Sequence, residues 1–399
     1  MCRGILIVLD SLGVGGAPDA KIYDDQGANT FGSIATACSK GVANEGRKGS
    51  LKIPHLENLG IYGALKLSDG TTLKNTNHNA GAFAVAREIS KGKDTPTGHH
   101  EIAGIIDLKG WHTFENIQPV FPEDKIQELI RSAEIEGILG DKHASGEKII
   151  FELGEAHLQS GLPIAYTSAD SVLQIAAHEE TFGLDRLYKL CRLALKIFAP
   201  LRVQRVIARP FLGDNKENFY RTKNRKDLIL PPLGETICDR ILSSGRKCFG
   251  IGKIGDIFAN RGFSATISGK SDAHLFEGML ETINCSKKGD LIFANFVEFD
   301  TLYGHKRDVS GYAKALEEFD KKLPRLFSIL DEEDLLIITA DHGNDPTFKG
   351  SDHTREQVPV LIKNKNFQNK NYGLITFSDI GATISKFLGL NPIQGTSIR

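Results

Sequence analysis

The sequence lacks the long apolar runs and the excess of one charge that mark several common classes of protein. Its uninterrupted apolar stretches, such as residues 5–9, are far too short to cross a bilayer, and Asp10 interrupts any signal-peptide core. The net charge is −1, from 49 basic and 50 acidic side chains, so no overall field attracts nucleic acid or acidic membranes. We therefore expect neither a nucleic-acid partner nor a membrane partner.

Cysteine is scarce and scattered along the chain. The six cysteines stand far apart, and no two form the C-x-x-C spacing of a zinc ribbon or a thiol redox site. A chain of 399 residues buries enough core to be stable without disulfides, so we expect reduced cysteines and a cytoplasmic location. Nothing in the sequence determines the oligomeric state.

What the sequence does contain is an alternation of short β-rich runs and helical patterns, which is typical of an α/β protein with a mostly parallel sheet. The predicted strands are 4–9, 164–166, 204–208, 247–251, 291–297, 335–339 and 358–362. The predicted helices are 125–133, 171–179, 186–198, 235–243, 312–330 and 378–388. Pro324 is expected to kink or split the longest of them.

The residues that could take part in catalysis or metal binding lie near the start of the chain and in its last hundred residues. A single site built from both ends implies one discontinuous core domain, 1–110 and 229–399, with a second domain inserted at 111–228. The polar loop 221–227, followed by Pro231 and Pro232, is the predicted return linker.

Three aspartates share one sequence context. Asp10, Asp300 and Asp341 each follow an apolar run predicted to be a strand. Ligands of open α/β sheets bind beyond the carboxyl ends of the strands, so these carboxylates are expected to converge there.

Histidines accompany these aspartates: His305 follows Asp300 by five residues, His342 follows Asp341 directly, and His353 stands in Ser-Asp-His-Thr. Carboxylate oxygens with imidazoles, and no thiolate, suit Mn²⁺ or Zn²⁺ better than Mg²⁺. Six candidate ligands exceed the needs of one ion and fit a two-metal centre that clamps a transferring phosphoryl group. The alternative is that Asp and His after strands only form turns and caps.

The segment 92–101, Gly-Lys-Asp-Thr-Pro-Thr-Gly-His-His-Glu, is a second candidate for chemistry. A Thr in a tight turn at a helix start can act as a nucleophile toward phosphate when a metal lowers its hydroxyl pKa. The alternative is an ordinary N-cap at Thr97.

Several polar side chains are candidates for binding an anionic substrate. Arg209 and Lys253 stand at the ends of apolar strands, whereas Arg221 and Arg225 have the alternative explanation of solvated loop charges. Ser168 and Asp170 follow another strand, in positions suited either to sugar hydroxyls or, with Thr167, to a capping box that opens a helix. The G-x-G-x-x-G match at 250–255 has no clear helix after it and is weak evidence for a nucleotide site.

Taken together, these motifs resemble the phosphopentomutases, a family within the alkaline phosphatase superfamily. The resemblance covers nearly the whole chain and is carried by residues 10–20, 92–101, 167–180, 205–211, 300–308 and 339–356. It implies an alkaline phosphatase-like core with a central, mostly parallel sheet and an inserted α+β cap domain. Two departures from the family pattern are His100, where Trp is usual, and Glu298, where Asp is usual.

The resemblance also implies the site. Thr95 matches the family nucleophile, which is carried as phosphothreonine, and two Mn²⁺ ions bind in each chain. One ion is implied to bind Asp10, Asp341 and His342, and the other Asp300, His305 and His353. The residues implied near the sugar phosphate are Ser168, Asp170, Arg209 and Lys253, with Arg221 and Arg225 as further candidates.

The function expected from the sequence is therefore interconversion of ribose (or deoxyribose) 1-phosphate and 5-phosphate. The phosphothreonine would donate its phosphoryl group to form a sugar bisphosphate, and a sugar bisphosphate would also prime the enzyme. One alternative is a phosphatase or phosphodiesterase that uses water as the acceptor at the same site. Another is a non-catalytic metal- or phosphate-binding protein, which would require a broken ligand position.

Overall fold

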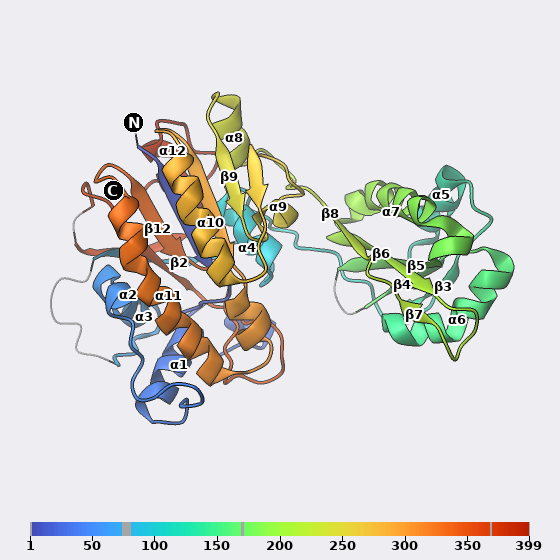
Figure 1. Ribbon diagram of the computed structural model, residues 1–399, viewed down its shortest axis with the longest axis horizontal. Helices are drawn as coiled ribbons and strands as arrows, with labels where there is room; N and C mark the ends of the chain where they lie inside the picture. Colours follow the sequence, from blue (N-terminus) through green and yellow to red (C-terminus); the bar gives the residue numbers. More distant parts are fainter. Residues whose placement is uncertain (1, 74–80, 169–170, 368, 399) are drawn as a thin grey trace. The chain divides into compact units, whose positions relative to one another are not determined.

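The computed structural model describes residues 2–73, 81–168, 171–367 and 369–398. It divides into two compact units, Met1–Lys109 with Pro232–Arg399 (the first unit) and Gly110–Pro231 (the second unit). Both units are shown in Figure 1. Their assignment as catalytic core and cap stays a prediction.

Among the described residues, the large sheet of the first unit has eight strands. Their order is β10 (Ala265–Ile267), β9 (Cys248–Ile251), β11 (Leu291–Phe296), β1 (Gly4–Leu9), β12 (Leu335–Thr339), β13 (Val358–Lys363), β2 (Ala82–Arg87) and β14 (Asn371–Thr376). All pairings are parallel except those of β13, which runs antiparallel to both neighbours. The central strands β11, β1 and β12 are buried along their whole length, as expected for continuous apolar runs covered on both faces.

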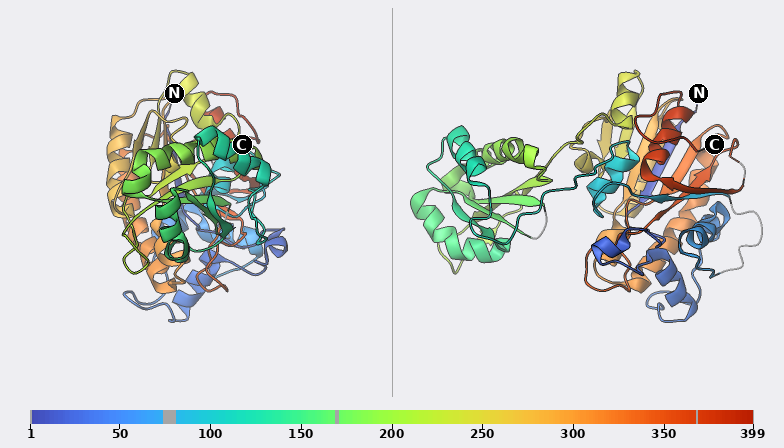
Figure 2. Two further views of the ribbon diagram at one scale, coloured as in Figure 1. Left: turned by 90° about the vertical axis from the view of Figure 1, so that its right-hand side faces the viewer. Right: turned by 180° about the vertical axis from the view of Figure 1, so that it is seen from behind.

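Helices cover both faces of this sheet (Figures 1 and 2). One face carries α1 (Thr30–Ser39), α2 (Pro54–Leu59), α3 (Ile61–Asp69), α10 (Asp272–Cys285) and α11 (Val309–Ile329). The other carries α4 (Thr95–Ile102), α8 (Ile237–Ser243), α9 (Ile254–Ile257) and α12 (Phe377–Phe387). The expected α/β class with a mostly parallel sheet is confirmed.

Pro324 does not split α11, although a split is one of the two outcomes expected from the sequence. The helix continues through Pro324 to Ile329. Buried residues on both sides of the proline, including Phe319, Leu323 and Leu326, hold the two halves against the core, and this packing outweighs the one lost backbone hydrogen bond.

The second unit is a mixed α+β structure. Within the described residues, its sheet has the order β3 (Leu139–His143), β4 (Ile164–Thr167), β5 (Val172–His178), β6 (Arg205–Leu212) and β7 (Tyr220–Arg221), with β8 (Lys226–Ile229) also paired to β6. Its helices are α5 (Glu123–Ala133), α6 (Gly146–Ser160) and α7 (Leu184–Phe198), together with the short turns η2 (Glu179–Gly183) and η3 (Ala199–Leu201).

The helix predicted at 171–179 is wrong, because this segment forms β5. Every residue of β5 is buried. A strand covered on both faces has a continuous apolar run rather than an alternating one, and such a run cannot be distinguished from a buried helix by periodicity.

Two further observations concern the expected environment of the chain. No helix in the described part of the chain combines the length and the apolar character needed to cross a membrane. All six cysteines are free thiols, and only Cys285 is exposed.

Candidate active site

Three aspartates meet at the carboxyl edge of the large sheet. The adjacent parallel strands β11, β1 and β12 are paired in register, Leu9 beside Phe296 and Val8 beside Thr339. Asp10 follows β1 directly, Asp341 lies two residues beyond β12, and Asp300 lies in η4 (Phe299–Gly304), the turn after β11. All three carboxylates are buried. The sheet topology therefore produces the convergence predicted from the sequence.

The three predicted histidines join these carboxylates. Asp300 Oδ2 lies 3.0 Å from His305 Nε2 and 3.4 Å from His353 Nε2. His342 Nε2 lies 3.4 Å from Asp10 Oδ1 and 3.4 Å from Asp341 Oδ2.

Possible ligand atoms fall into two compact groups within the described residues. One contains Asp300, His305 and His353, and the other contains Asp10, Asp300 and His342, with all ligand atoms of a group within 4.8 Å of one another. Asp300 belongs to both groups. The set that the resemblance implies with Asp10 and His342 contains Asp341 in place of Asp300. We call the six side chains the ligand cluster: Asp10, Asp300, His305, Asp341, His342 and His353.

The electrostatics of the ligand cluster fit divalent cations. Asp10 Oδ1 is a buried oxygen without a hydrogen-bond partner among the described groups, and the buried Asp341 Oδ2 has His99 Nδ1 at 3.1 Å. Burial, together with the charges of Asp341 and Asp300, raises the pKa of Asp10 well above its ordinary value. Burial lowers the pKa of His342, which keeps its imidazole neutral and able to bind metal. A cation among these groups would satisfy both oxygens and remove the repulsion between carboxylates.

Backbone carbonyls orient the three histidines. The Nδ1 atoms lie 2.6 Å from Ser351 O in His305, 3.0 Å from Gly343 O in His342 and 2.9 Å from Lys93 O in His353. Because a carbonyl only accepts, each Nδ1 carries a proton and each Nε2 faces the cluster.

Two asparagines that the sequence analysis missed support the carboxylates. Asn295 Nδ2 donates to Asp10 Oδ2 at 2.9 Å, and Asn344 Nδ2 donates to Asp300 Oδ1 at 2.7 Å. Both asparagines are completely buried. An Asn within the apolar run of β11 was the available signal for Asn295, because a buried amide needs a partner.

Thr95 lies beside the ligand cluster at the first position of α4. Its Oγ1 is 3.1 Å from His342 Nε2. The N-cap of α4 is Asp94, which accepts from the backbone N–H of Thr97, so the alternative of an N-cap at Thr97 is wrong. Gly98 allows α4 to approach this closely, since a Cβ there would lie 2.1 Å from Asp341 O.

Arg209 and Ser168 of the second unit are linked through Gln174. Arg209 Nε donates to Gln174 Oε1 at 2.9 Å, and Gln174 Nε2 donates to Ser168 Oγ at 3.3 Å. Burial lowers the pKa of Arg209, and the charges of Arg225 and Arg221 act in the same direction. Mutual repulsion of this kind favours the binding of an anion.

The other two arginines of this face are paired with carboxylates of their own unit. Arg221 forms an ion pair with Glu147 at 2.5 Å, and Arg225 forms one with Asp227 at 2.6 Å. We call Arg209, Arg221 and Arg225 the arginine face. Lys253 is an exposed residue of the first unit at the N-cap of α9.

The predicted helical capping role around Thr167 is wrong. Thr167 Oγ1 donates to Val172 O at 2.6 Å, and β5 rather than a helix follows. Ser168 is half-buried, and Asp170 lies outside the described residues.

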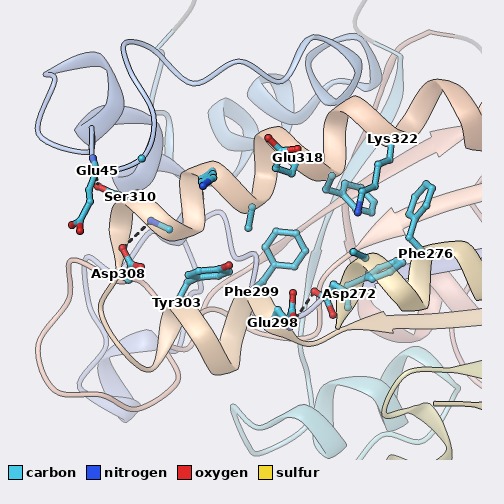
Figure 3. A pocket seen from close by; sticks show the side chains of 17 residues that line it. Glu45, Asp272, Phe276, Glu298, Phe299, Tyr303, Asp308, Ser310, Glu318 and Lys322 are labelled. Carbon is cyan, nitrogen blue, oxygen red and sulfur yellow. Dashed lines mark hydrogen bonds between the residues drawn. The ribbon is translucent and has the colours of Figure 1, made fainter. Parts of the chain in front are cut away.

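Neither residue that departs from the family pattern is a member of the ligand cluster. His100 is 4% exposed, its Nε2 lies 3.0 Å from Ile257 O, and burial lowers its pKa to about 4. Glu298 lines a cavity of about 620 Å³ on the side of α10 and α11, where Asp272 accepts its backbone N–H at 3.1 Å (Figure 3). Among its described lining residues this cavity includes no member of the ligand cluster.

Comparison with known proteins identifies the family. Residues 2–392 match the model of the metalloenzyme superfamily. A phosphopentomutase of Chelativorans sp. (strain BNC1) is 49% identical over 98% of this chain and 96% of its own length. A phosphopentomutase of Shewanella loihica is 46% identical over 99% of this chain and 98% of its own length. The chain therefore belongs to the metalloenzyme superfamily and, within it, to the phosphopentomutase family of isomerases.

Proposed function

We propose that the chain interconverts ribose (or deoxyribose) 1-phosphate and 5-phosphate through a phosphothreonine at Thr95. The observation that carries this proposal is the position of the Thr95 hydroxyl, 3.1 Å from His342 at the start of α4. Backbone N–H groups at a helix start favour an incoming phosphate, and the neighbouring cluster offers ligands for cations. Pentose phosphates are thus the proposed substrates.

The proposed cofactor is a pair of Mn²⁺ ions. One would be held by Asp10, Asp341 and His342, and the other by Asp300, His305 and His353. When bound, such ions neutralise phosphoryl oxygens and lower the pKa of a coordinated hydroxyl. The buried Asp10 Oδ1, which lacks a partner among the described groups, and the histidines whose Nε2 atoms face the cluster support this assignment.

In the proposed reaction, phosphothreonine at Thr95 transfers its phosphoryl group to the free hydroxyl of the sugar phosphate. The P–O bond to Thr95 Oγ1 breaks, a P–O bond to the sugar forms, and the proton of the sugar hydroxyl passes to Thr95. The resulting sugar bisphosphate reorients and returns its other phosphoryl group to Thr95. A sugar bisphosphate supplied from outside would prime unphosphorylated enzyme by the same step.

The proposed substrate-binding residues are Ser168, Asp170, Arg209 and Lys253, with Arg221 and Arg225 as further candidates. Arginine forks and the lysine ammonium would bind the non-reacting phosphate, and Ser168 and Asp170 would bind sugar hydroxyls. We also propose a cytoplasmic location, which the six free thiols support.

The test is isomerisation of ribose 1-phosphate with Mn²⁺, before and after chelation, by wild type, Thr95→Ala and Thr95→Ser. Thr95→Ala is expected to lose at least about 10⁴-fold in turnover and to show no phosphorylated species by intact mass. Thr95→Ser keeps a hydroxyl, so it is the matched control and is expected to retain partial activity. Near-normal turnover by Thr95→Ala, or predominant release of free phosphate by wild type, would overturn the proposal.

A further inference from the structure

Arg355 is a buried arginine two residues after His353, in the loop between β12 and β13. Arg355 is 3% exposed. Its guanidinium reaches residues 88–93, the segment that connects β2 to α4 and therefore leads to Thr95. We call this segment the approach loop.

The guanidinium makes several hydrogen bonds to the approach loop. Arg355 Nη1 donates to Gly92 O at 2.6 Å and also to the Glu88 carboxylate. Arg355 Nη2 donates to Glu88 O at 2.8 Å. One planar group thus fixes both ends of the loop.

The other edge of the guanidinium binds the segment around η1 (Ala20–Tyr23). Arg355 Nε and Nη2 donate to Asp19 at 3.1 and 2.9 Å. The guanidinium also lies over the ring of Tyr23, 5.1 Å from its centroid, and the Tyr23 hydroxyl accepts from Gly92 N at 3.2 Å. These contacts give the approach loop a second anchor through the same arginine.

Further hydrogen bonds connect Arg355 with the ligand cluster. Arg355 N donates to Asp25 Oδ2 at 2.8 Å, and Asp25 also accepts from Lys93 Nζ at 3.1 Å. The carbonyl of Lys93 is the group that orients His353, at 2.9 Å from its Nδ1. Any shift of the approach loop would therefore move the partner of a predicted metal ligand and the start of the predicted nucleophile helix together.

We propose that Arg355 is a positioning residue, which holds the approach loop so that Thr95 and His353 keep a fixed relation within the ligand cluster. The inference rests on the proposed function for the role of Thr95. Arg355 touches neither substrate nor metal in this proposal. Lysine could not replace it, because a single ammonium cannot present a planar fork to two carbonyls and two carboxylates.

The test compares Arg355→Gln with Arg47→Gln as a matched control. Arg47 is also buried in the first unit, where it pairs with Glu317 and donates to the carbonyls of Ala43, Gly49 and Ser50. Both variants lose a buried ion pair, but the Arg47 contacts include neither the approach loop nor the ligand cluster. Any general loss of stability should therefore be shared by the two variants.

Two readouts are independent of turnover: Mn²⁺ titration of the metal-free protein, and amide hydrogen exchange of residues 88–93. For Arg355→Gln we expect Mn²⁺ affinity to fall about 10–100-fold and approach-loop exchange to accelerate at least about 10-fold. For Arg47→Gln we expect neither change. Equal Mn²⁺ affinity and equal approach-loop exchange in the two variants would overturn the proposal.

A milder variant keeps the test decisive if Arg355→Gln does not fold. Asp19→Asn leaves Arg355 in place and weakens only the half-buried outer contact. We expect faster approach-loop exchange and a lower kcat at an unchanged KM, and wild-type values of both would contradict the proposal. A wild-type enzyme that only releases phosphate would overturn the mutase assignment, while the exchange and Mn²⁺ data would still decide the role of Arg355.

Discussion

The ligand cluster of the first unit and the arginine face of the second unit hold their charged side chains in opposite environments. Asp10 and Asp341 are fully buried, and Asp10 Oδ1 lacks a hydrogen-bond partner among the described groups. Arg221 and Arg225, by contrast, are exposed and already paired with carboxylates of their own unit.

The two regions also differ in the structural elements that position their side chains. The cluster is built at the ends of buried strands, so the sheet sets its geometry before any ligand arrives. In the arginine face, Arg209 lies on β6, whereas Arg221 lies on the short strand β7 and Arg225 in the loop before β8. Any anion at Arg221 and Arg225 would have to compete with their existing ion pairs. Substitutions in the first region should therefore cost much more than substitutions in the second.

The largest effect is expected for Asp300→Asn. Asp300 belongs to both groups of possible ligands, so its loss should weaken both proposed metal sites and lower turnover by at least about 10³-fold. Metal content per chain and isomerisation rate are the measurements. Asp308→Asn is the control, because Asp308 is the N-cap of α11 and asparagine caps equally well. A full complement of Mn²⁺ in Asp300→Asn would contradict the comparison.

A second prediction is that the free energy of unfolding depends on a neutral imidazole at His100, in α4. Burial lowers the pKa of His100 from 6.5 to about 4, so the folded state resists protonation that the unfolded state accepts. The stabilising contribution is complete above pH 6.5 and is lost as the pH falls toward 4, by about 3 kcal/mol in total.

His100→Gln keeps a donor for Ile257 O but cannot titrate, so it should flatten this part of the pH dependence. Urea unfolding of wild type and variant at pH 7 and pH 5 measures the difference. An unchanged slope between these two pH values would show that His100 has the same pKa in the folded and unfolded states.

A third prediction is that Asn295 affects metal affinity much more than thermal stability. Asn295→Leu removes the hydrogen bond to Asp10 and also removes a buried amide oxygen that has no partner among the described groups. Because the second change offsets the first, we expect little change in Tm but a fall in Mn²⁺ affinity of about 10–100-fold. Calorimetric titration and thermal unfolding check both parts, and parallel losses of Tm and affinity would refute the separation.

The smallest effect is expected on the arginine face. Asp227→Asn should release Arg225 and lower the KM for ribose 5-phosphate by about 2–5-fold, the range of an exposed ion pair. Arg209→Gln should instead raise KM, since no ion pair between Arg209 and a carboxylate is found among the described residues. A rise in KM for Asp227→Asn would mean that this carboxylate itself assists binding.

The ligand cluster could be predicted from the sequence because each member has a strong local context. Asp10, Asp300 and Asp341 follow buried parallel strands, whose ends meet at one edge whatever the details of packing. The supporting groups lack such a context. Arg355 and Asn344 act through contacts with residues far away in the sequence, and those distances are set only by tertiary structure.

The second unit was harder to predict for a related reason. The segment 171–179 was predicted as a helix because β5 carries buried residues on both faces and shows no alternation. In the first unit, β1 and β12 are equally apolar, but Asp10 directly follows β1 and Asp341 stands two residues beyond β12, so an aspartate marks the end of each apolar run. Where no such marker exists, composition alone does not separate the two kinds of element.

The central place of β1 has a consequence for biosynthesis. Its neighbours β11 and β12 begin at Leu291 and Leu335, so the first strand to leave the ribosome finds its partners only after most of the chain has been made. The second unit, whose residues are contiguous, has no such delay and can fold while β1 is still unpaired. Because the ligand cluster takes residues from Asp10 to His353, it can be complete only when most of the chain has been synthesised.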